Sequence, residues 1–263
     1  MKKLYLFAAI LVSIIVVPGF VSAGTTCATK YPVILAHGMG ASAQILGIVD
    51  YWWGIDNALA NNGAKVYKTS VNGMDSTTAK AASFKTQFLQ ILAATGAAKA
   101  NIIAHSHGAL YTRYAISNLG LSTKVASWTS MCGPNRGSYI ANLVCYNTPT
   151  FIRNALGGSL NFVYAFIFGD TSPNSLQNGY DLCTDYVINT FNPNTPNKTG
   201  VYYQSWASKG KTSVPDIILE PTWLILLAHD GANDGLVAES SAKWGTYKGC
   251  QSAAWYSVGC DHL

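Results

Sequence analysis

The sequence predicts an α/β fold built on a doubly wound, mostly parallel sheet. Short apolar runs typical of buried strands alternate along the chain with longer segments typical of helices. We expect strands at residues 33–36, 65–71, 100–104, 124–130, 200–206 and 222–228, and helices at residues 54–61, 77–94 and 107–118. The chain has 263 residues and no internal repeat or linker, which suits one domain with a large core.

The first 23 residues have the composition of a signal peptide. Lys2 and Lys3 precede an apolar run over residues 4–20, and Val21-Ser22-Ala23 is a small-residue cleavage site. We therefore expect a secreted protein whose mature domain is residues 24–263. An uncleaved membrane anchor is the alternative, because the apolar run nearly reaches the length that spans a bilayer.

Charge and cysteine content fit an exported protein. The formal net charge is only +5 and the basic residues are scattered, so we expect no nucleic-acid partner. The chain contains six cysteines, and in an exported chain these predict disulfide bonds whose pairing the sequence alone leaves open. None of them has the C-x-x-C spacing of a metal or redox site.

Residues 104–108 (Ala-His-Ser-His-Gly) predict a nucleophilic serine. They lie between an expected strand and an expected helix, and the small residues Ala104 and Gly108 flank the central Ser106. In this setting the chain makes a sharp turn that lifts the serine hydroxyl above the sheet, which is the geometry of a nucleophile elbow. Because a free serine is a poor nucleophile, Ser106 requires a base and an oxyanion hole nearby.

The first expected strand runs directly into His37-Gly38-Met39-Gly40. Glycines just beyond a strand allow backbone N–H groups to approach a ligand closely, which is how half of an oxyanion hole is built. The other half is the amide that follows the nucleophile. We therefore assign the oxyanion hole to the backbone N–H groups of Met39 and His107.

The remaining partners of Ser106 should follow it in the order acid, then histidine. Asp234 lies shortly after the apolar run 222–228, and His262 is the histidine beyond it. We predict that Asp234 and His262 complete a catalytic triad, with Asp230 as the rival acid. His229 is expected to be a polar residue at the end of a strand.

These motifs belong to a collinear series that resembles the Pseudomonas-type bacterial true lipases. The series as a whole spans over half of the mature chain, and its shared segments are residues 32–38, 49–55, 62–67, 91–97, 105–108, 133–138, 233–237 and 262–263. The resemblance implies an α/β-hydrolase fold with a helical lid insertion at about residues 139–170. It also implies a triacylglycerol lipase that works at a lipid–water interface on acylglycerol esters.

The resemblance carries further expectations. It implies a lipase-specific foldase as a partner, and a disulfide from Cys183 to Cys250 or Cys260. It also implies a structural Ca²⁺ ion, for which Asp216 is the nearest candidate ligand, although a complete site cannot be assembled from this sequence. The sequence departs from the family at Ala104, where glycine is usual, and in ending at Leu263 without a further helix.

The predicted chemistry is ester hydrolysis through an acyl-enzyme on Ser106, with no cofactor for catalysis. Two enzymatic alternatives use the same residues: a carboxylesterase and a transacylase, acting on short-chain or polymeric esters. A third alternative is a non-catalytic surface protein, if the chain truly ends at Leu263 and His262 is frayed.

Overall fold

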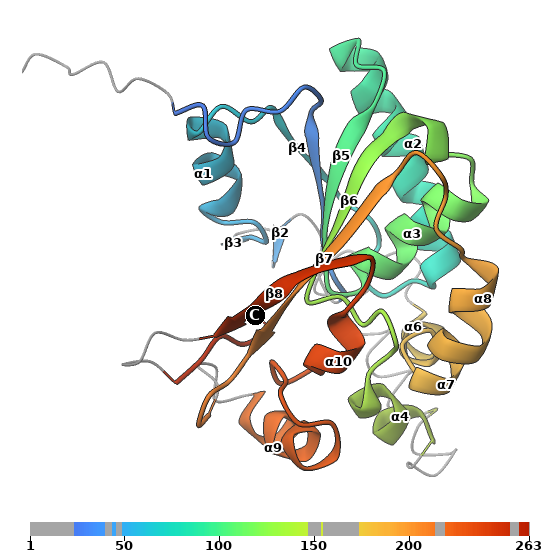
Figure 1. The fold of residues 1–263 in the computed structure, drawn as a ribbon. Coiled ribbons are helices and arrows are strands. Elements are labelled where there is room, and N and C mark those ends of the chain that lie inside the picture. Colours follow the sequence, from blue (N-terminus) through green and yellow to red (C-terminus); the bar gives the residue numbers. More distant parts are fainter. Residues whose placement is uncertain are drawn as a thin grey trace, which may run out of the picture.

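A six-stranded parallel sheet forms the centre of the computed structural model, which describes residues 24–39, 44–45, 49–146, 154, 174–213, 219–252 and 258–262. The strands follow the order β4-β1-β5-β6-β7-β8 (Figure 1). Their bounds are β1 Val33–Ala36, β4 Val66–Thr69, β5 Ala100–His105, β6 Val125–Met131, β7 Tyr202–Lys209 and β8 Thr246–Ser252. A short antiparallel pair, β2 Gln44–Ile45 and β3 Val49–Asp50, lies outside this sheet.

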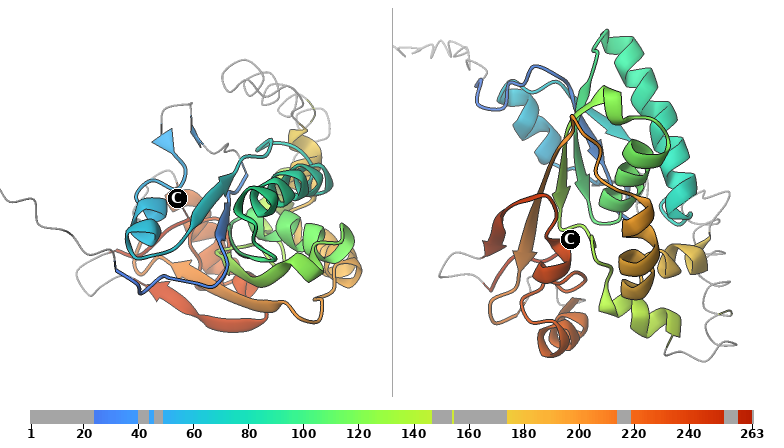
Figure 2. Two further views of the ribbon diagram at one scale, coloured as in Figure 1. Left: turned by 90° about the horizontal axis from the view of Figure 1, so that it is seen from above. Right: turned by 45° about the vertical axis from the view of Figure 1, so that its right-hand side comes forward.

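Helices cover both faces of the sheet, as the alternation of side chains along β1 shows. On one face, Ile34 and Ala36 belong to the large core under the helices α2 (Thr77–Thr95) and α3 (Gly108–Asn118). On the other face, Val33 and Leu35 belong to a smaller core that includes Leu59 of the helix α1 (Ile55–Asn61). Successive side chains of a strand point to opposite faces, so a strand buried on both faces is apolar throughout. In both views the helix α1 lies on one side of the sheet, and α2 and α3 lie on the other (Figure 2).

The remaining helices are short and gather beyond the carboxyl ends of the strands. They are α4 Tyr139–Tyr146, α6 Ser175–Tyr180, α7 Thr184–Tyr186, the π-helical turn Val187–Phe191, α8 Asn192–Asn194, α9 Glu220–His229 and α10 Glu239–Ala242. A separate 3-10 turn at Ser122–Lys124 precedes β6. In the described part of the chain, no helix is long and apolar enough to cross a membrane. The predicted signal peptide, residues 1–23, lies outside the described residues.

The α/β architecture is confirmed, and every predicted strand but one is present. The exception is the run at residues 222–228, which belongs to helix α9. A short apolar run does not distinguish a buried strand from a helix. Here Pro221 in the first turn and the three leucines favour the helix, which buries Trp223 and Leu226.

Strand β8 was not among the predicted strands. Its residues 246–252 (Thr-Tyr-Lys-Gly-Cys-Gln-Ser) contain no apolar run, because it is the edge strand of the sheet and is partly exposed along its length. Of the predicted lid at residues 139–170, the structure describes the helix α4 and Asn154, and the rest lies outside the described residues.

Candidate active site

The turn between β5 and α3 places Ser106 at the carboxyl end of a central strand. Ser106 has a φ of 55°, a left-handed conformation that few non-glycine residues adopt. Gly108 follows because a Cβ there would lie 2.5 Å from the carbonyl oxygen of Ala36 on the neighbouring strand. The predicted elbow is therefore present, with a sharp turn that raises the hydroxyl of Ser106 above the sheet.

Ser106, His262 and Asp234 form a continuous chain of hydrogen bonds, although they are far apart in the sequence. Nε2 of His262 lies 2.8 Å from Oγ of Ser106, and Nδ1 lies 2.8 Å from Oδ2 of Asp234. Because an ionised carboxylate only accepts hydrogen bonds, Nδ1 carries the proton and Nε2 is the acceptor for the serine hydroxyl. The three residues thus have the geometry of nucleophile, base and orienting acid.

Asp234 is 1% exposed, and its carboxylate is held by several donors. Oδ1 accepts hydrogen bonds from the backbone N–H groups of Leu236 and Val237, at 3.0 and 2.7 Å. Burial alone would raise the pKa of the carboxyl, but the charge and hydrogen bond of His262 and these two amides hold the pKa below its usual value. Asp234 therefore stays ionised beside His262, which is itself 4% exposed.

The predicted oxyanion loop lies directly against the nucleophile. A Cβ at Gly38 would lie 2.7 Å from Cβ of Ser106, so only glycine allows the loop to approach this closely. The hydroxyl of Tyr111 holds the loop by donating a hydrogen bond of 2.9 Å to the carbonyl oxygen of His37. Met39 follows at the rim of the site, with 45% of its side chain exposed.

The fully buried ring of His37 also fixes this loop. Its Nε2 accepts a hydrogen bond of 3.0 Å from the backbone N–H of Val71, so Nδ1 carries the proton and donates to the carbonyl oxygen of Gly38 at 2.9 Å. Burial lowers the pKa of His37 to about 4, and the neutral ring can make both bonds at once. His37 is therefore a positioning group for the loop.

Tyr51 and His105 connect this loop to the base. The hydroxyl of Tyr51 accepts a hydrogen bond from the backbone N–H of Gly38 at 3.1 Å and is hydrogen-bonded to Nδ1 of His105 at 2.5 Å. The ring of His105 packs against that of His262, with 4.8 Å between their centroids. Burial, and then the neighbouring His262, lower the pKa of His105 to about 3, so the base has a neutral neighbour.

The residue after the nucleophile, His107, is anchored by a buried lysine. Nζ of Lys80 donates a hydrogen bond to Nδ1 of His107 at 3.0 Å, and Nε2 of His107 lies 2.7 Å from the hydroxyl of Thr77. Lys80 is 1% exposed and also donates to the carbonyl oxygen of Gly73 and to Asn178. Burial, and then the charge of Lys80, hold the pKa of His107 well below its usual value, so the ring is neutral.

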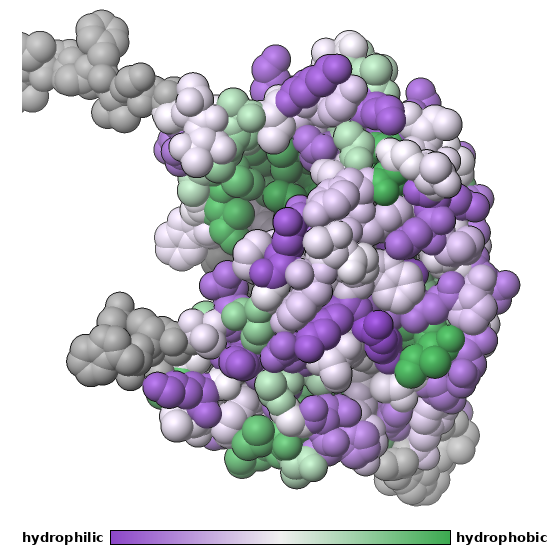
Figure 3. All heavy atoms as spheres, in the orientation of Figure 1, coloured by the Kyte–Doolittle hydropathy of each residue, from purple (hydrophilic) through white to green (hydrophobic). Residues whose placement is uncertain are grey.

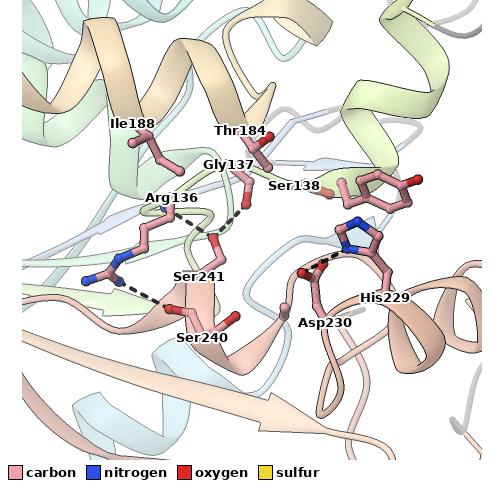
Figure 4. A pocket seen from close by; sticks show the side chains of 11 residues that line it. Arg136, Gly137, Ser138, Thr184, Ile188, His229, Asp230, Ser240 and Ser241 are labelled. Atoms are coloured by element: carbon pink, nitrogen blue, oxygen red, sulfur yellow. Dashed lines mark hydrogen bonds and ion pairs between the residues drawn. The ribbon is translucent and has the colours of Figure 1, made fainter.

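The rival acid, Asp230, lies elsewhere. Asp230 is the residue directly after helix α9, and its carboxylate lies 3.1 Å from Nδ1 of His229. The ring of His229 stacks on that of Tyr139, with 3.6 Å between the ring centroids. These residues line a pocket of about 290 Å³ that Ser106 does not line (Figure 4). His229 is thus the last residue of a helix, not of a strand as predicted.

The sequence did not assign roles to Tyr51, His105 or Lys80. Tyr51 lies in a segment shared with the lipases, and His105 adjoins the serine, but no local pattern indicates that their side chains meet. Likewise, nothing in the sequence of α2 distinguishes the buried Lys80 from Lys85 five residues later. Only the packing of α2 against α3 brings this ammonium group to the elbow.

Two other predictions concern metal and disulfides. Asp216, the candidate Ca²⁺ ligand, lies outside the described residues, and among the described residues no group of three or more His, Cys, Asp or Glu could hold a metal ion. No disulfide joins any of the six cysteines in the structure. Cys183 lies against Cys145, whereas Cys250 lies near Tyr247 and Glu239, and the expected bridge from Cys183 to Cys250 or Cys260 is not formed in the structure.

Comparisons with known proteins agree with this fold. The family model described as "alpha/beta hydrolase fold" matches residues 31–250. A triacylglycerol lipase of Vibrio cholerae is 32% identical over 240 residues, which is 82% of this chain and 75% of that protein. A triacylglycerol lipase of Burkholderia plantarii is 41% identical over 130 residues, which is 48% of this chain but only 36% of that protein.

Among solved structures, a metagenomic carboxyl esterase superposes with a TM-score of 0.70 at 20% identity, over 90% of this chain and 66% of that chain. At this level of identity the superposition supports the fold alone. The family match covers most of the described residues and includes both the oxyanion loop and the elbow. The chain therefore belongs to the α/β-hydrolase fold family.

Proposed function

We propose that this protein is a secreted serine hydrolase that cleaves the ester bonds of acylglycerols, with triacylglycerol as its principal substrate. The proposal rests above all on the hydrogen-bond chain from Ser106 through His262 to Asp234. Membership of the α/β-hydrolase family supports it, as does similarity to two proteins named triacylglycerol lipase.

In the acylation step, Nε2 of His262 takes the proton of Ser106 as its oxygen attacks the ester carbonyl. Asp234 keeps the ring in the required tautomer and stabilises the imidazolium that forms. His262 then gives the proton to the departing alcohol, which leaves an acyl group on Ser106. A water molecule, activated by the same histidine, attacks this acyl-enzyme and releases the fatty acid.

The negative charge of the tetrahedral intermediate develops where backbone amides can receive it. We assign its stabilisation to the N–H groups of Met39 and His107. The second of these precedes the first turn of the 11-residue helix α3, whose dipole also favours negative charge. Loss of one such donor typically reduces the rate on the order of 10²–10³-fold. The nucleophile, the base and the donors are all protein groups, so the proposed reaction needs no cofactor.

An exposed apolar surface supports a substrate at a lipid–water interface. Leu224, Ile225 and Leu227 of α9 are 41–52% exposed, and Val144 of α4 is 57% exposed. The stacking of Tyr139 on His229 joins these two helices. Apolar side chains gather at the lower edge of the molecule, over α9 (Figure 3). Transfer of this surface into lipid would contribute about 25 cal/mol per Å².

The expected lid extends this proposal. Residues 139–170 would supply further apolar surface over the site, and Phe166 and Phe168 within them lie outside the described residues. Replacing both phenylalanines with serine should reduce hydrolysis of emulsified substrate more than hydrolysis of dissolved esters. Equal losses would favour a carboxylesterase.

Two parts of the proposal concern how the protein matures. Export through residues 1–23 predicts that the secreted protein begins at Gly24, which N-terminal sequencing measures; retention of the leader would favour the membrane anchor. The lipase-specific foldase, which rests on the resemblance alone, predicts poor recovery of activity when the denatured chain refolds by itself. Full specific activity without a helper would overturn that part.

The central experiment compares emulsified long-chain triacylglycerol with dissolved short-chain esters, using the wild type and Ser106→Ala. The proposal predicts fatty-acid release that is faster from the emulsion and is abolished in Ser106→Ala, while the circular dichroism spectrum stays unchanged. Activity on dissolved esters alone would indicate a carboxylesterase. Transfer of the acyl group to an added alcohol in preference to water would indicate a transacylase.

A further inference from the structure

Two cysteines meet between helices α4 and α7. Cys145 lies in the last turn of α4, and Cys183 directly precedes α7. Their residues are 3% and 0% exposed, and the thiol of Cys183 is hydrogen-bonded to that of Cys145. Neither thiol belongs to the hydrogen-bond chain of Ser106, so the proposed reaction leaves this pair without a role.

Both sulfur atoms lie against Gly179, near the end of α6. Sγ of Cys183 is 3.6 Å from the carbonyl oxygen of Gly179, and a Cβ at position 179 would lie 3.0 Å from Sγ of Cys145. Both sulfurs thus lie beside the same residue, and a side chain at position 179 would crowd the sulfur of Cys145. This is the close approach that a bond between the two side chains requires.

Hydrogen bonds on both sides of the pair hold α4 and α7 in this relationship. Asn142 donates to the hydroxyl of Thr184 at 2.6 Å and accepts from the backbone N–H of Thr184 at 2.9 Å. The hydroxyl of Tyr146 donates to Asp185 at 3.2 Å. Because the residues that flank each cysteine are bonded to one another, the contact between the sulfurs is set by the packing of the two segments.

The chemistry of a buried thiol determines when such a bond can form. The hydrogen bond from Cys145, and then burial, raise the pKa of the Cys183 thiol, so the reactive thiolate is strongly disfavoured in the folded protein. An oxidant also needs access to one of the sulfurs. Oxidation therefore belongs to folding, before α4 closes over the pair.

We propose that Cys145 and Cys183 form a disulfide bond as the exported chain folds. The oxidant is a disulfide, either of an oxidoreductase or of oxidised glutathione. The thiolate of one cysteine attacks this disulfide, forms a mixed disulfide and releases one thiol; the second cysteine then displaces the other thiol. Two electrons and two protons pass from the cysteines to the oxidant, one S–S bond breaks, and one forms.

This bond would tie the helix at the start of the predicted lid to the segment after it. It closes a loop of about 40 residues, which limits the freedom of the unfolded chain and so stabilises the folded one.

Peptide mapping tests the bond directly. The mature chain is produced in an oxidising compartment, denatured and alkylated without reductant, and digested with trypsin. Trypsin cuts after Arg136, Arg153 and Lys198, so Cys145 and Cys183 fall in separate peptides, 137–153 and 154–198, that contain no other cysteine. We expect these peptides to be joined and to separate on reduction. Alkylation of both cysteines, or a link from either to another cysteine, would overturn the proposal.

Thermal unfolding provides a second measurement. The oxidised protein should unfold at a temperature about 5–15 °C higher than the same chain made in a reducing cytoplasm. This difference should persist in Cys27→Ala, whose cysteine packs near α1, and should disappear in Cys145→Ala/Cys183→Ala. If the unfolding temperatures of the oxidised and reduced double variant differ as much as those of the wild type, the assignment is refuted. If the double variant does not fold, the peptide map of the wild type decides.

Discussion

The hydroxyl of Tyr51 lies 2.5 Å from Nδ1 of His105 and also accepts the N–H of Gly38. Through this hydroxyl, the oxyanion loop and the ring that packs against His262 share one hydrogen-bond network. Movement of the loop would therefore disturb the base.

Tyr51→Phe should lower kcat on a dissolved ester by about 30-fold, because a net hydrogen bond contributes about 1 kcal/mol, two are lost, and about 1.4 kcal/mol corresponds to a factor of ten. The matched control is Tyr203→Phe, which also removes a hydroxyl that accepts a backbone N–H at 3.1 Å, from Lys198, but outside the site. Steady-state kinetics measure both variants. An equal fall in the control would show that the effect on kcat is a general loss of stability.

Lys80→Met should reduce both activity and stability. The change leaves Nδ1 of His107 and the carbonyl oxygen of Gly73 without their buried donor, and each unsatisfied group costs about 1–3 kcal/mol of stability. It also loosens His107, whose backbone N–H is the proposed oxyanion donor. We expect kcat to fall about tenfold at a temperature where the variant is fully folded. Lys85→Met, on the same helix but partly exposed, is the control. An unchanged kcat in Lys80→Met would limit Lys80 to a structural role.

Asp234→Asn should lower kcat on the order of 10³–10⁴-fold, because an amide favours the wrong tautomer of His262. Asp230→Asn should stay near the wild-type rate, since Asp230 pairs with His229 in a different pocket. Rates on a p-nitrophenyl ester provide the comparison. A large loss in Asp230→Asn with little loss in Asp234→Asn would exchange the roles of the two acids.

The buried residues His37 and His107 and the partly buried His105 make the fold sensitive to acid. Burial lowers the pKa of His37 to about 4 and that of His105 to about 3, and holds that of His107 well below its usual value. The unfolded chain binds protons at these rings below about pH 6.5, whereas the folded chain does not until the pH is far lower. The free energy of unfolding should therefore fall between about pH 6.5 and pH 4, by at most about 1.4 kcal/mol per pH unit for each histidine.

Urea unfolding over this range measures the slope. His105→Phe should make the slope shallower, by up to the contribution of one histidine. Asp234 acts in another window: its lowered pKa means that the stability it adds is present above about pH 3.8 and is lost only below. The same slope in His105→Phe and the wild type would contradict a neutral His105 in the folded protein.

The sequence predicted the parts of the site that follow from local geometry. The turn around Ser106 and the glycine before Met39 are both set by backbone requirements that leave a pattern in a few adjacent residues. Asp234 and His262 could be placed by their order along the chain. Their hydrogen bonds to one another required the folded structure.

The rest depends on contacts between distant segments. Helix α9 was mistaken for a strand because its apolar run reflects an exposed surface as well as a core. The meeting of Tyr51 with His105, and of Cys145 with Cys183, comes from packing between elements more than 30 residues apart. No periodicity in either segment encodes such a contact.

Covalent labelling with a fluorophosphonate, followed by peptide mass spectrometry, tests the central claim most directly. A serine activated by a neighbouring histidine reacts with this probe, whereas an ordinary serine does not. We predict one label per molecule, on Ser106, with ester hydrolysis lost in proportion and no labelling of Ser106→Ala. An unlabelled Ser106 in a protein that hydrolyses esters, or a label on another serine, would contradict the account.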